Sequence, residues 1–321
     1  MNYDIIGDIH GHAEALRNLL HDLGYRETQG AWRQSGRQVI FVGDFIDRGP
    51  QQKATVDLVR RMVDAGAARA VMGNHELNAI AWHTRDPDDS RDYLRSHYSE
   101  KHGAKNFKQH IAFLREVEGS PQHKEIINWF LTLPVFLELP EIRVVHACWH
   151  QNYMDFLAEH LTADGRLTES VLVQATREPK NEAEKDTPEP TIFKAVEALL
   201  KGVEVPLPAP HSFFDKDGHD RNRVRVRWWD NEATDYRRAA MLPADERSEF
   251  PEAPVPSHAL IGHDGGKPVF VGHYWLTGIP TLLSDKVACL DYSVAKEGKL
   301  VAYRWDGEPT LDDRKLHWVR P

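Results

Sequence analysis

The stretch Gly43-Asp44-Phe45-Ile46-Asp47-Arg48-Gly49 places two carboxylates and a guanidinium between two glycines, directly after the apolar run Val39-Ile40-Phe41-Val42. That run is short and rich in β-branched and aromatic residues, which is typical of a strand buried on both faces in a mostly parallel sheet. Asp44 then lies at the carboxyl end of the strand, the edge at which open α/β sheets bind ligands. Because clustered carboxylates are costly without a compensating cation or partner, we predict an active-site loop here.

Two further strands are predicted to end in similar loops. Tyr3–Ile6 is followed by Gly7-Asp8-Ile9-His10-Gly11, and Ala70–Met72 is followed by Gly73-Asn74-His75-Glu76. Apolar residues at helical spacing come after each loop, so the chain repeats a strand, a polar loop and a helix. This repetition predicts that three loops bring polar side chains to one edge of one sheet.

A second sheet is predicted from four apolar runs near the end of the sequence, at residues 268–271, 281–283, 287–290 and 300–303. Together with the first strands, these runs predict an α/β fold of two mixed β-sheets that form a sandwich flanked by helices. The 321 residues, of which 41% are hydrophobic, are enough for one large domain with an insertion.

Two regions depart from the repeating pattern. Residues 83–133 begin with a charged, polar stretch and continue with two helical patterns, which indicates a cap inserted into the domain. Residues 179–256 contain ten of the nineteen prolines, which is typical of long loops. We therefore expect a single domain over residues 1–321, with a helical and loop cap at 83–133 and a proline-rich loop region at 179–256.

The composition excludes several classes of protein. A formal net charge of -9 argues against general binding to nucleic-acid backbones, which relies on clusters of Lys and Arg. The two cysteines, Cys148 and Cys289, are far apart and suggest neither a disulfide framework nor a cysteine zinc site. The first apolar run is too short for a signal peptide or a membrane span, so we expect a cytoplasmic protein without a membrane partner.

The strand-end residues include six typical metal ligands: Asp8, His10, Asp44, Asn74, His146 and His273. Carboxylate, amide and imidazole ligands without a thiolate suit Mn, Fe or Zn. Asp8 and His10, one residue apart, can point into one site from an extended chain. Because the two oxygens of Asp44 can bridge two ions, a pair of divalent metals is predicted.

These motifs resemble the calcineurin-like metallophosphoesterases. Gly7–Gly11, Gly43–Gly49 and Gly73–Glu76 match the family's GDxHG, GDxxDRG and GNHE signatures, and Val145-His146-Ala147 and Gly272-His273 follow in the family's order. The match is strongest to the PPP branch of phosphoprotein phosphatases. It covers residues 1 to about 150 and about 269 to 305, and it leaves the proline-rich region unexplained.

The resemblance implies a role for each matched residue. Asp8, His10 and Asp44 would hold one metal, and Asp44, Asn74, His146 and His273 the other. Hydroxide activated by the two metals, most simply Mn²⁺, would attack phosphorus in line. Arg48 would grip two phosphate oxygens, and His75, oriented by Asp47, would protonate the leaving group.

Some assignments stay open in the sequence. The predicted phosphate-contacting residues are Arg48, Asn74 and Arg227, but Arg221, Arg223 and Arg225 lie equally near to the position that the family uses. His263 also follows a glycine and an apolar run, and His273 is preferred for its spacing to Asp291. The histidines at 83, 97, 102 and 110 are interpreted as surface or cap residues.

The resemblance favours hydrolysis of phosphate monoesters by a bacterial type of protein serine/threonine phosphatase. A hydrolase of dinucleoside polyphosphates, such as diadenosine tetraphosphate, or of other nucleotides is the alternative, because the same signatures occur there. The partner would accordingly be a phosphorylated protein or a nucleotide. A phosphate-binding scaffold without catalysis is disfavoured, since Asp47, Arg48 and His75 are all present.

Overall fold

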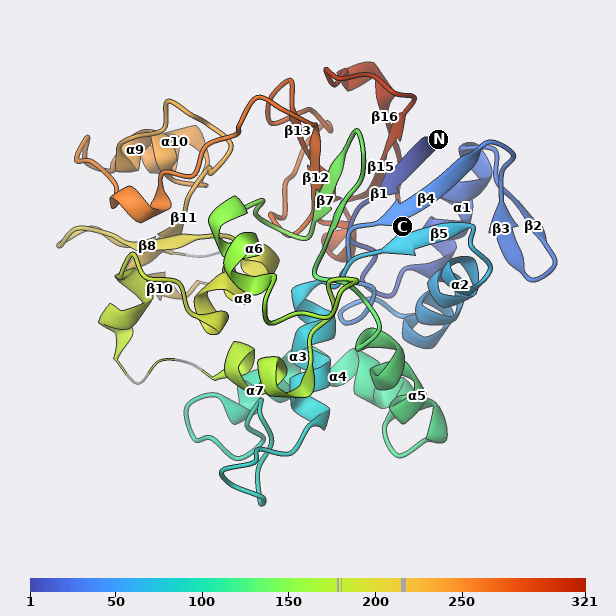
Figure 1. The fold of residues 1–321 in the computed structure, drawn as a ribbon, viewed down its shortest axis with the longest axis horizontal. Coiled ribbons are helices and arrows are strands. Elements are labelled where there is room, and N and C mark those ends of the chain that lie inside the picture. The colour runs from blue at the N-terminus through green and yellow to red at the C-terminus, as the bar shows by residue number, and fades with distance from the viewer. Residues whose placement is uncertain (178, 180, 215–217) are drawn as a thin grey trace.

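A computed structural model describes residues 1–177, 179, 181–214 and 218–321 of the chain (Figure 1). Its larger sheet has the strand order β14-β15-β1-β4-β5, with β16 also paired to β15. The strands are β1 (Asn2–Ile6), β4 (Arg37–Phe41), β5 (Ala68–Ala70), β14 (Asp291–Tyr292), β15 (Lys299–Trp305) and β16 (Leu316–Val319). β1, β4 and β5 run parallel, whereas β15 is antiparallel to β1.

The smaller sheet has the order β13-β12-β7-β6. It consists of β6 (Phe136–Glu138), β7 (Arg143–Val145), β12 (Val269–Val271) and β13 (Val287–Cys289). Ile5, Ile40 and Val301 of the larger sheet pack against Val144 and Phe270 of the smaller one, and all five side chains are fully buried. This confirms the predicted α/β fold of two mixed sheets packed face to face.

Helices α1 (Ala13–Asp22) and α2 (Gln52–Asp64) cover the outer face of the larger sheet. Helix α3 (Asn74–His83) follows β5 and packs against α5 (Pro121–Phe130). Leu16 of α1 and Val56 of α2 belong to the same buried cluster as Phe41 of β4. These apolar residues recur at helical spacing, which is why each segment forms a helix with one buried face.

The second group of apolar runs is distributed differently from the prediction. Residues 299–305 form β15 of the larger sheet, and 281–283 form no strand. In that segment the N–H of Thr281 donates to the Tyr292 hydroxyl, and the N–H of Leu282 donates to the Asp313 carboxylate. Because side chains already accept hydrogen bonds from these backbone N–H groups, the segment does not need to pair with a strand.

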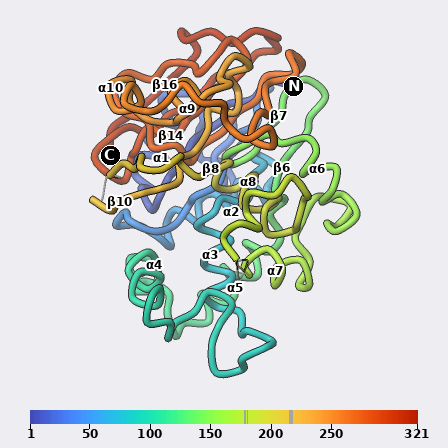
Figure 2. Tube along the Cα trace, turned by 90° about the vertical axis from the view of Figure 1, so that its left-hand side faces the viewer, coloured from blue at the N-terminus to red at the C-terminus, as the bar shows by residue number. Residues whose placement is uncertain are grey.

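The remaining elements are a hairpin between α1 and β4, two helices after β7, and the elements of the two regions that interrupt the pattern. They are β2 (Arg26–Thr28), β3 (Ala31–Arg33), α4 (Gly103–Val117), α5 (Pro121–Phe130), α6 (Gln151–Leu157), α7 (Glu169–Thr176), α8 (Ile192–Lys201), β8 (Glu204–Pro206), β9 (Phe213–Phe214), β10 (Asp220–Arg221), β11 (Arg223–Arg225), α9 (Tyr236–Ala239) and α10 (Ala244–Arg247). α4 and α5 lie below the sheets in the views of Figures 1 and 2. No helix in the described part of the chain has the length and apolar character needed to cross a bilayer.

Candidate metal centre

The carboxyl ends of five strands meet at one place between the sheets. Asp8 and His10 follow β1, Asp44 follows β4, and Asn74 begins α3 shortly after β5. From the smaller sheet, His146 follows β7 and His273 follows β12. All six side chains are at most 9% exposed. The fold thus brings residues more than 260 positions apart into one buried cluster.

Asp44 lies at the centre of this cluster. Its Oδ2 atom is 3.3 Å from Nε2 of His146 and 3.8 Å from Nε2 of His10. Two sets of side chains have potential ligand atoms within 4.8 Å of one another, namely His10, Asp44 and His75, and Asp44, His146 and His273. Asp44 is the member that both sets share, as a bridging carboxylate would be.

Asn74 and Asp8 complete the cluster on the side of His273. The Oδ1 atom of Asn74 is 2.8 Å from Nδ1 of His273 and 3.2 Å from Nε2 of His146. The Asp8 carboxylate accepts a hydrogen bond of 3.1 Å from the backbone N–H of His273. Asp8 belongs to neither set of potential ligands among the described residues.

Backbone carbonyls orient two of the imidazoles. Nδ1 of His10 is 2.9 Å from the carbonyl oxygen of Ile46, and Nδ1 of His146 is 2.7 Å from that of Val42. When each Nδ1 donates to its carbonyl, Nε2 is left unprotonated and faces Asp44. Metal-binding histidines are commonly held by such a bond from the other ring nitrogen.

The cluster fits divalent cations. Nε2 of His10 and Nε2 of His273 are buried and have no hydrogen-bond partner among the described residues. Burial, together with the neighbouring carboxylates of Asp291 and Asp44, raises the pKa of Asp8 well above its usual range. A cation would relieve this repulsion and give the unpartnered nitrogens a ligand role. The oxygen and nitrogen donors suit Mn, Fe or Zn.

The backbone is strained around the cluster. Nine non-glycine residues in the described part of the chain have positive φ, and six of them lie here: His10, Asp44, Asp47, Arg48, His273 and Trp275. Such conformations cost about 1–3 kcal/mol each and concentrate at functional sites. The concentration supports a functional role for these loops.

Two glycines allow the loops to approach closely. A Cβ atom at Gly272 would lie 1.9 Å from Oδ1 of Asp8, and one at Gly73 would lie 2.2 Å from Oδ1 of Asp44. Neither contact is possible for a side-chain carbon. The glycines of the sequence motifs therefore make room for the carboxylates.

His75 and Asp47 lie beside the cluster. Nδ1 of His75 is 2.5 Å from Oδ2 of Asp47, and Nε2 of His75 is 3.9 Å from Oδ2 of Asp44. The His75 ring also packs edge-on against His10, with ring centroids 4.8 Å apart. His75 is thus held by Asp47 with its second nitrogen toward the potential metal ligands.

Arg48 is exposed at the entrance to the cluster. Its guanidinium stacks over the Trp275 ring at 4.0 Å from the ring centroid, and that ring lies 5.6 Å from the ring of His10. A cation over an aromatic face is held in place without losing its hydrogen-bond donors. Arg48 can therefore turn its donors toward an anion at the site.

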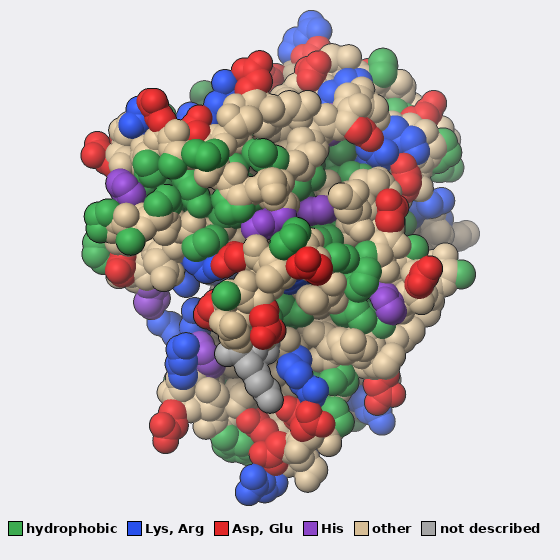
Figure 3. Space-filling view, turned by 60° about the vertical axis from the view of Figure 1, so that its left-hand side comes forward, with side chains coloured by type: hydrophobic (Ala, Val, Ile, Leu, Met, Phe, Trp, Pro, Cys, Tyr) green, Lys and Arg blue, Asp and Glu red, His purple; other side chains and the backbone are tan. Residues whose placement is uncertain are grey.

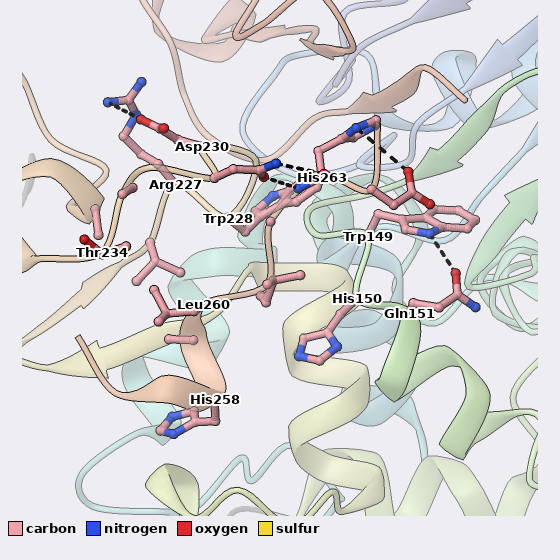
Figure 4. A pocket seen from close by; sticks show the side chains of 18 of the residues that line it. Trp149, His150, Gln151, Arg227, Trp228, Asp230, Thr234, His258, Leu260 and His263 are labelled. Carbon is pink, nitrogen blue, oxygen red and sulfur yellow. Dashed lines mark hydrogen bonds and ion pairs between the residues drawn. The ribbon is translucent and has the colours of Figure 1, made fainter. Parts of the chain in front are cut away.

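Arg227 and His263 lie elsewhere. Both line a cavity of about 480 Å³ with Trp149 and Trp228, and no predicted metal ligand lines this cavity among the described residues (Figure 4). Arg227 points toward Asp230, with 3.7 Å between Nη1 and Oδ2. The geometry places His273, and not His263, beside Asp44 and Asn74.

The structure adds residues that the motifs alone did not assign. Glu76 is fully buried and accepts hydrogen bonds from the backbone N–H groups of Asp44, Phe45 and Gly73. His110, interpreted from the sequence as a surface or cap residue, is fully buried, with Nδ1 2.8 Å from Oδ2 of Asp47. Glu76 could have been suspected from its place in the third motif, whereas no local pattern marks His110.

Comparison with known proteins gives a family match and several relatives. A family model described as calcineurin-like phosphoesterase matches residues 1–170. The asymmetrical bis(5'-nucleosyl)-tetraphosphatase PrpE of Oceanobacillus iheyensis is 34% identical over 149 residues, which cover 46% of this chain and 55% of that protein. The protein of the same name from Bacillus cereus strain B4264 is 33% identical over 164 residues, covering 48% and 60%.

The chain spans little more than half the length of these curated relatives. Among solved structures, a protein serine/threonine phosphatase from Saccharomyces cerevisiae aligns with 99% of this chain and 79% of its own, at 12% identity and a TM-score of 0.44. A likeness this remote does not bear on function.

Proposed function

The chain belongs to the calcineurin-like phosphoesterase family, and from this premise we propose that it hydrolyses phosphate esters at the cluster around Asp44. The observation that carries the proposal is the sharing of Asp44 by two sets of ligand atoms, with the His75–Asp47 pair beside them. A two-metal hydrolase needs such a bridge and a proton donor next to it.

We propose Asp8, His10 and Asp44 as ligands of one divalent ion, and Asp44, Asn74, His146 and His273 as ligands of the other. When bound, two such ions supply Lewis acidity and lower the pKa of a coordinated water. Manganese is our first choice, with iron and zinc as alternatives, because the donor set suits all three.

The protein's own side chains have separate tasks in this proposal. Arg48 binds two phosphoryl oxygens through its planar fork, a geometry that lysine lacks. His75 gives a proton to the leaving oxygen, and Asp47 holds its ring in the required orientation. Asn74 contacts the phosphoryl group beside its ligand role.

The insertion at residues 83–133 supports this arrangement from the side. The Nε2 atom of Gln109, on α4, is 3.5 Å from Nδ1 of His75, and the neighbouring His110 contacts Asp47. We propose that this segment acts as a cap that orders the proton donor.

The favoured substrate is a dinucleoside polyphosphate. The sequence motifs alone favoured a phosphoprotein, but the curated relatives reported above are named as tetraphosphatases and are 33–34% identical over the region that carries the motifs. We therefore place the alternative first and keep the protein serine/threonine phosphatase second.

A substrate screen tests this order. The purified chain is supplied with Mn²⁺, and release of phosphate or nucleotide is measured from diadenosine tetraphosphate, a phosphoserine peptide and a mononucleotide. We expect the highest kcat/KM with diadenosine tetraphosphate. A higher value with the phosphopeptide would restore the protein phosphatase, and no turnover with any of them would refute the phosphoesterase proposal.

A further inference from the structure

A second cavity, of about 350 Å³, is lined by basic side chains and is called the basic cavity below. Seven of its lining residues are Lys or Arg and only two are Glu, although the whole chain carries a net charge of -9. These charged residues lie on helices α4 and α8, on strands β8, β10 and β11, and in the segment before α8. Figure 3 shows Lys and Arg side chains bordering a hollow between the upper and lower parts of the molecule.

Nearby acids form ion pairs with at least four of the seven cations, Lys185, Lys201, Arg223 and Arg225. Arg223 forms two hydrogen bonds to Asp186, of 2.9 and 2.6 Å, and Arg225 lies 3.2 Å from Glu204. Lys105 is exposed and forms no ion pair with any residue that the structure describes. Positive charges gathered in a recess focus their electrostatic field and attract anions.

One wall of the basic cavity packs against Tyr274, a buried residue next to the metal centre. Gly202 lines the cavity, and a Cβ atom there would lie 2.8 Å from the Tyr274 hydroxyl. Tyr274 directly follows His273, one of the potential ligands. The rings of His273 and Tyr274 lie 5.7 Å apart, so Tyr274 contacts residues of both sites.

Helix α4, which carries Lys105, connects the basic cavity with the proton donor. Lys105 lies on α4 one helical turn before Gln109, so both side chains project from the same side of the helix. Gln109 in turn reaches to 3.5 Å from Nδ1 of His75. The helix that contributes Lys105 to the basic cavity therefore also contacts the proton donor.

We propose that the basic cavity binds the phosphates of a polyphosphate chain that lie beyond the phosphate being cleaved. This inference rests on the proposed function. It assigns recognition of the length of the phosphate chain to residues outside the family motifs. Arginine forks and lysine ammonium groups are the usual ligands of phosphate oxygens. A folded phosphoprotein would need a wide surface, whereas a phosphate chain concentrates several charges within a recess of this size.

The first test separates an effect on recognition of the phosphate chain from an effect on catalysis. KM and kcat are measured with Mn²⁺ for diadenosine tetraphosphate and for p-nitrophenyl phosphate, which has one phosphate. Lys105→Glu should raise KM for diadenosine tetraphosphate about tenfold and leave p-nitrophenyl phosphate within about twofold. Lys108→Glu, also exposed on α4 but outside the cavity, makes the same change in charge and should alter neither. An equal effect of Lys105→Glu on both substrates would overturn the proposal.

The second test does not depend on turnover. Binding of inorganic tripolyphosphate and of inorganic phosphate to the metal-loaded full chain is measured by calorimetry. Tripolyphosphate should bind at least about tenfold tighter, and Lys105→Glu, but not Lys108→Glu, should remove that advantage. If no ester is hydrolysed, the proposed function fails. The same binding pattern would still support the binding of a phosphate chain in the basic cavity. Equal tripolyphosphate binding by the two variants, or tighter binding of a phosphopeptide of equal charge, would overturn it.

Discussion

The Nδ1 atom of His75 lies 2.5 Å from Oδ2 of Asp47, and Nδ1 of His110 lies 2.8 Å from the same oxygen. Burial opposes the charge on Asp47, but His110 and His75 outweigh it and lower the pKa of Asp47 to about 2. The carboxylate is therefore ionised at neutral pH. It holds the His75 ring through Nδ1 and leaves Nε2 available on the side of Asp44.

Replacing His75 by alanine tests its role as proton donor. General acids typically contribute about 10²–10⁴-fold to the rate, so His75→Ala should lower kcat for diadenosine tetraphosphate by about that factor. Because the proposal assigns no metal to His75, both metal ions should stay bound, as measured by elemental analysis.

The exposed His102 supplies the matched control for that experiment. His102→Ala removes a histidine of the insertion whose side chain does not contact Asp47, so kcat should not change. An unaltered kcat in His75→Ala would contradict the proton-donor role. Loss of a metal ion would instead identify His75 as a metal ligand, which its position near His10 and Asp44 allows.

Asp44→Asn tests the bridge between the two metal sites. The amide is neutral and offers one oxygen, so both sites should weaken, and elemental analysis should find less than two metal equivalents per chain. Asp57→Asn, which changes a half-exposed carboxylate on α2, should leave the metal content unchanged. Retention of both ions by Asp44→Asn would contradict the bridging role.

The loops around Asp8, Asp44 and Asn74 were predictable because each combines a buried apolar strand with glycine and a short polar sequence. Their meeting point follows from the parallel pairing of β1, β4 and β5. Parallel strands present their carboxyl ends at one edge, so local patterns are enough to place these residues together.

The residues supplied by other parts of the chain could not be predicted in this way. His110 reaches Asp47 from α4, and its burial depends on how the insertion packs rather than on its neighbours in sequence. The phosphate-contacting role of Arg227 stays a prediction, and its side chain lies in a cavity with Asp230. Apolar and basic residues alternate over Val224-Arg225-Val226-Arg227, so the pattern puts both arginines on the same face and does not distinguish them.

Glu76→Ala should destabilise the protein strongly. The Glu76 carboxylate accepts hydrogen bonds from three buried N–H groups, those of Asp44, Phe45 and Gly73. A buried donor without a partner costs about 1–3 kcal/mol, so the free energy of unfolding should fall by about 3 kcal/mol or more. Urea denaturation measures this value, and Glu125→Ala, at an exposed position of α5, should change it by less than about 0.5 kcal/mol. A similar small change for Glu76→Ala would show that the loops are held by other contacts.

Acid should weaken the packing of the insertion through His123. On α5, the His123 ring packs against Phe113 and lies 4.6 Å from the ring of His83. Burial, and then the charge of His83, lowers the pKa of His123 from 6.5 to about 4. Between these two pH values the unfolded chain binds a proton that the folded chain does not, so stability falls as the pH decreases from 6.5 to 4.

His123→Phe removes this titration and keeps an aromatic ring in the packing. The Tm of the variant should therefore exceed that of the unaltered protein at pH 5, with a smaller difference at pH 8, as measured by scanning calorimetry. His102→Phe adds the same ring at an exposed position of the insertion and should not produce the difference between the two pH values. If His123→Phe shifted Tm equally at pH 5 and pH 8, its effect would come from packing alone, and protonation of His123 would not be the source of acid sensitivity.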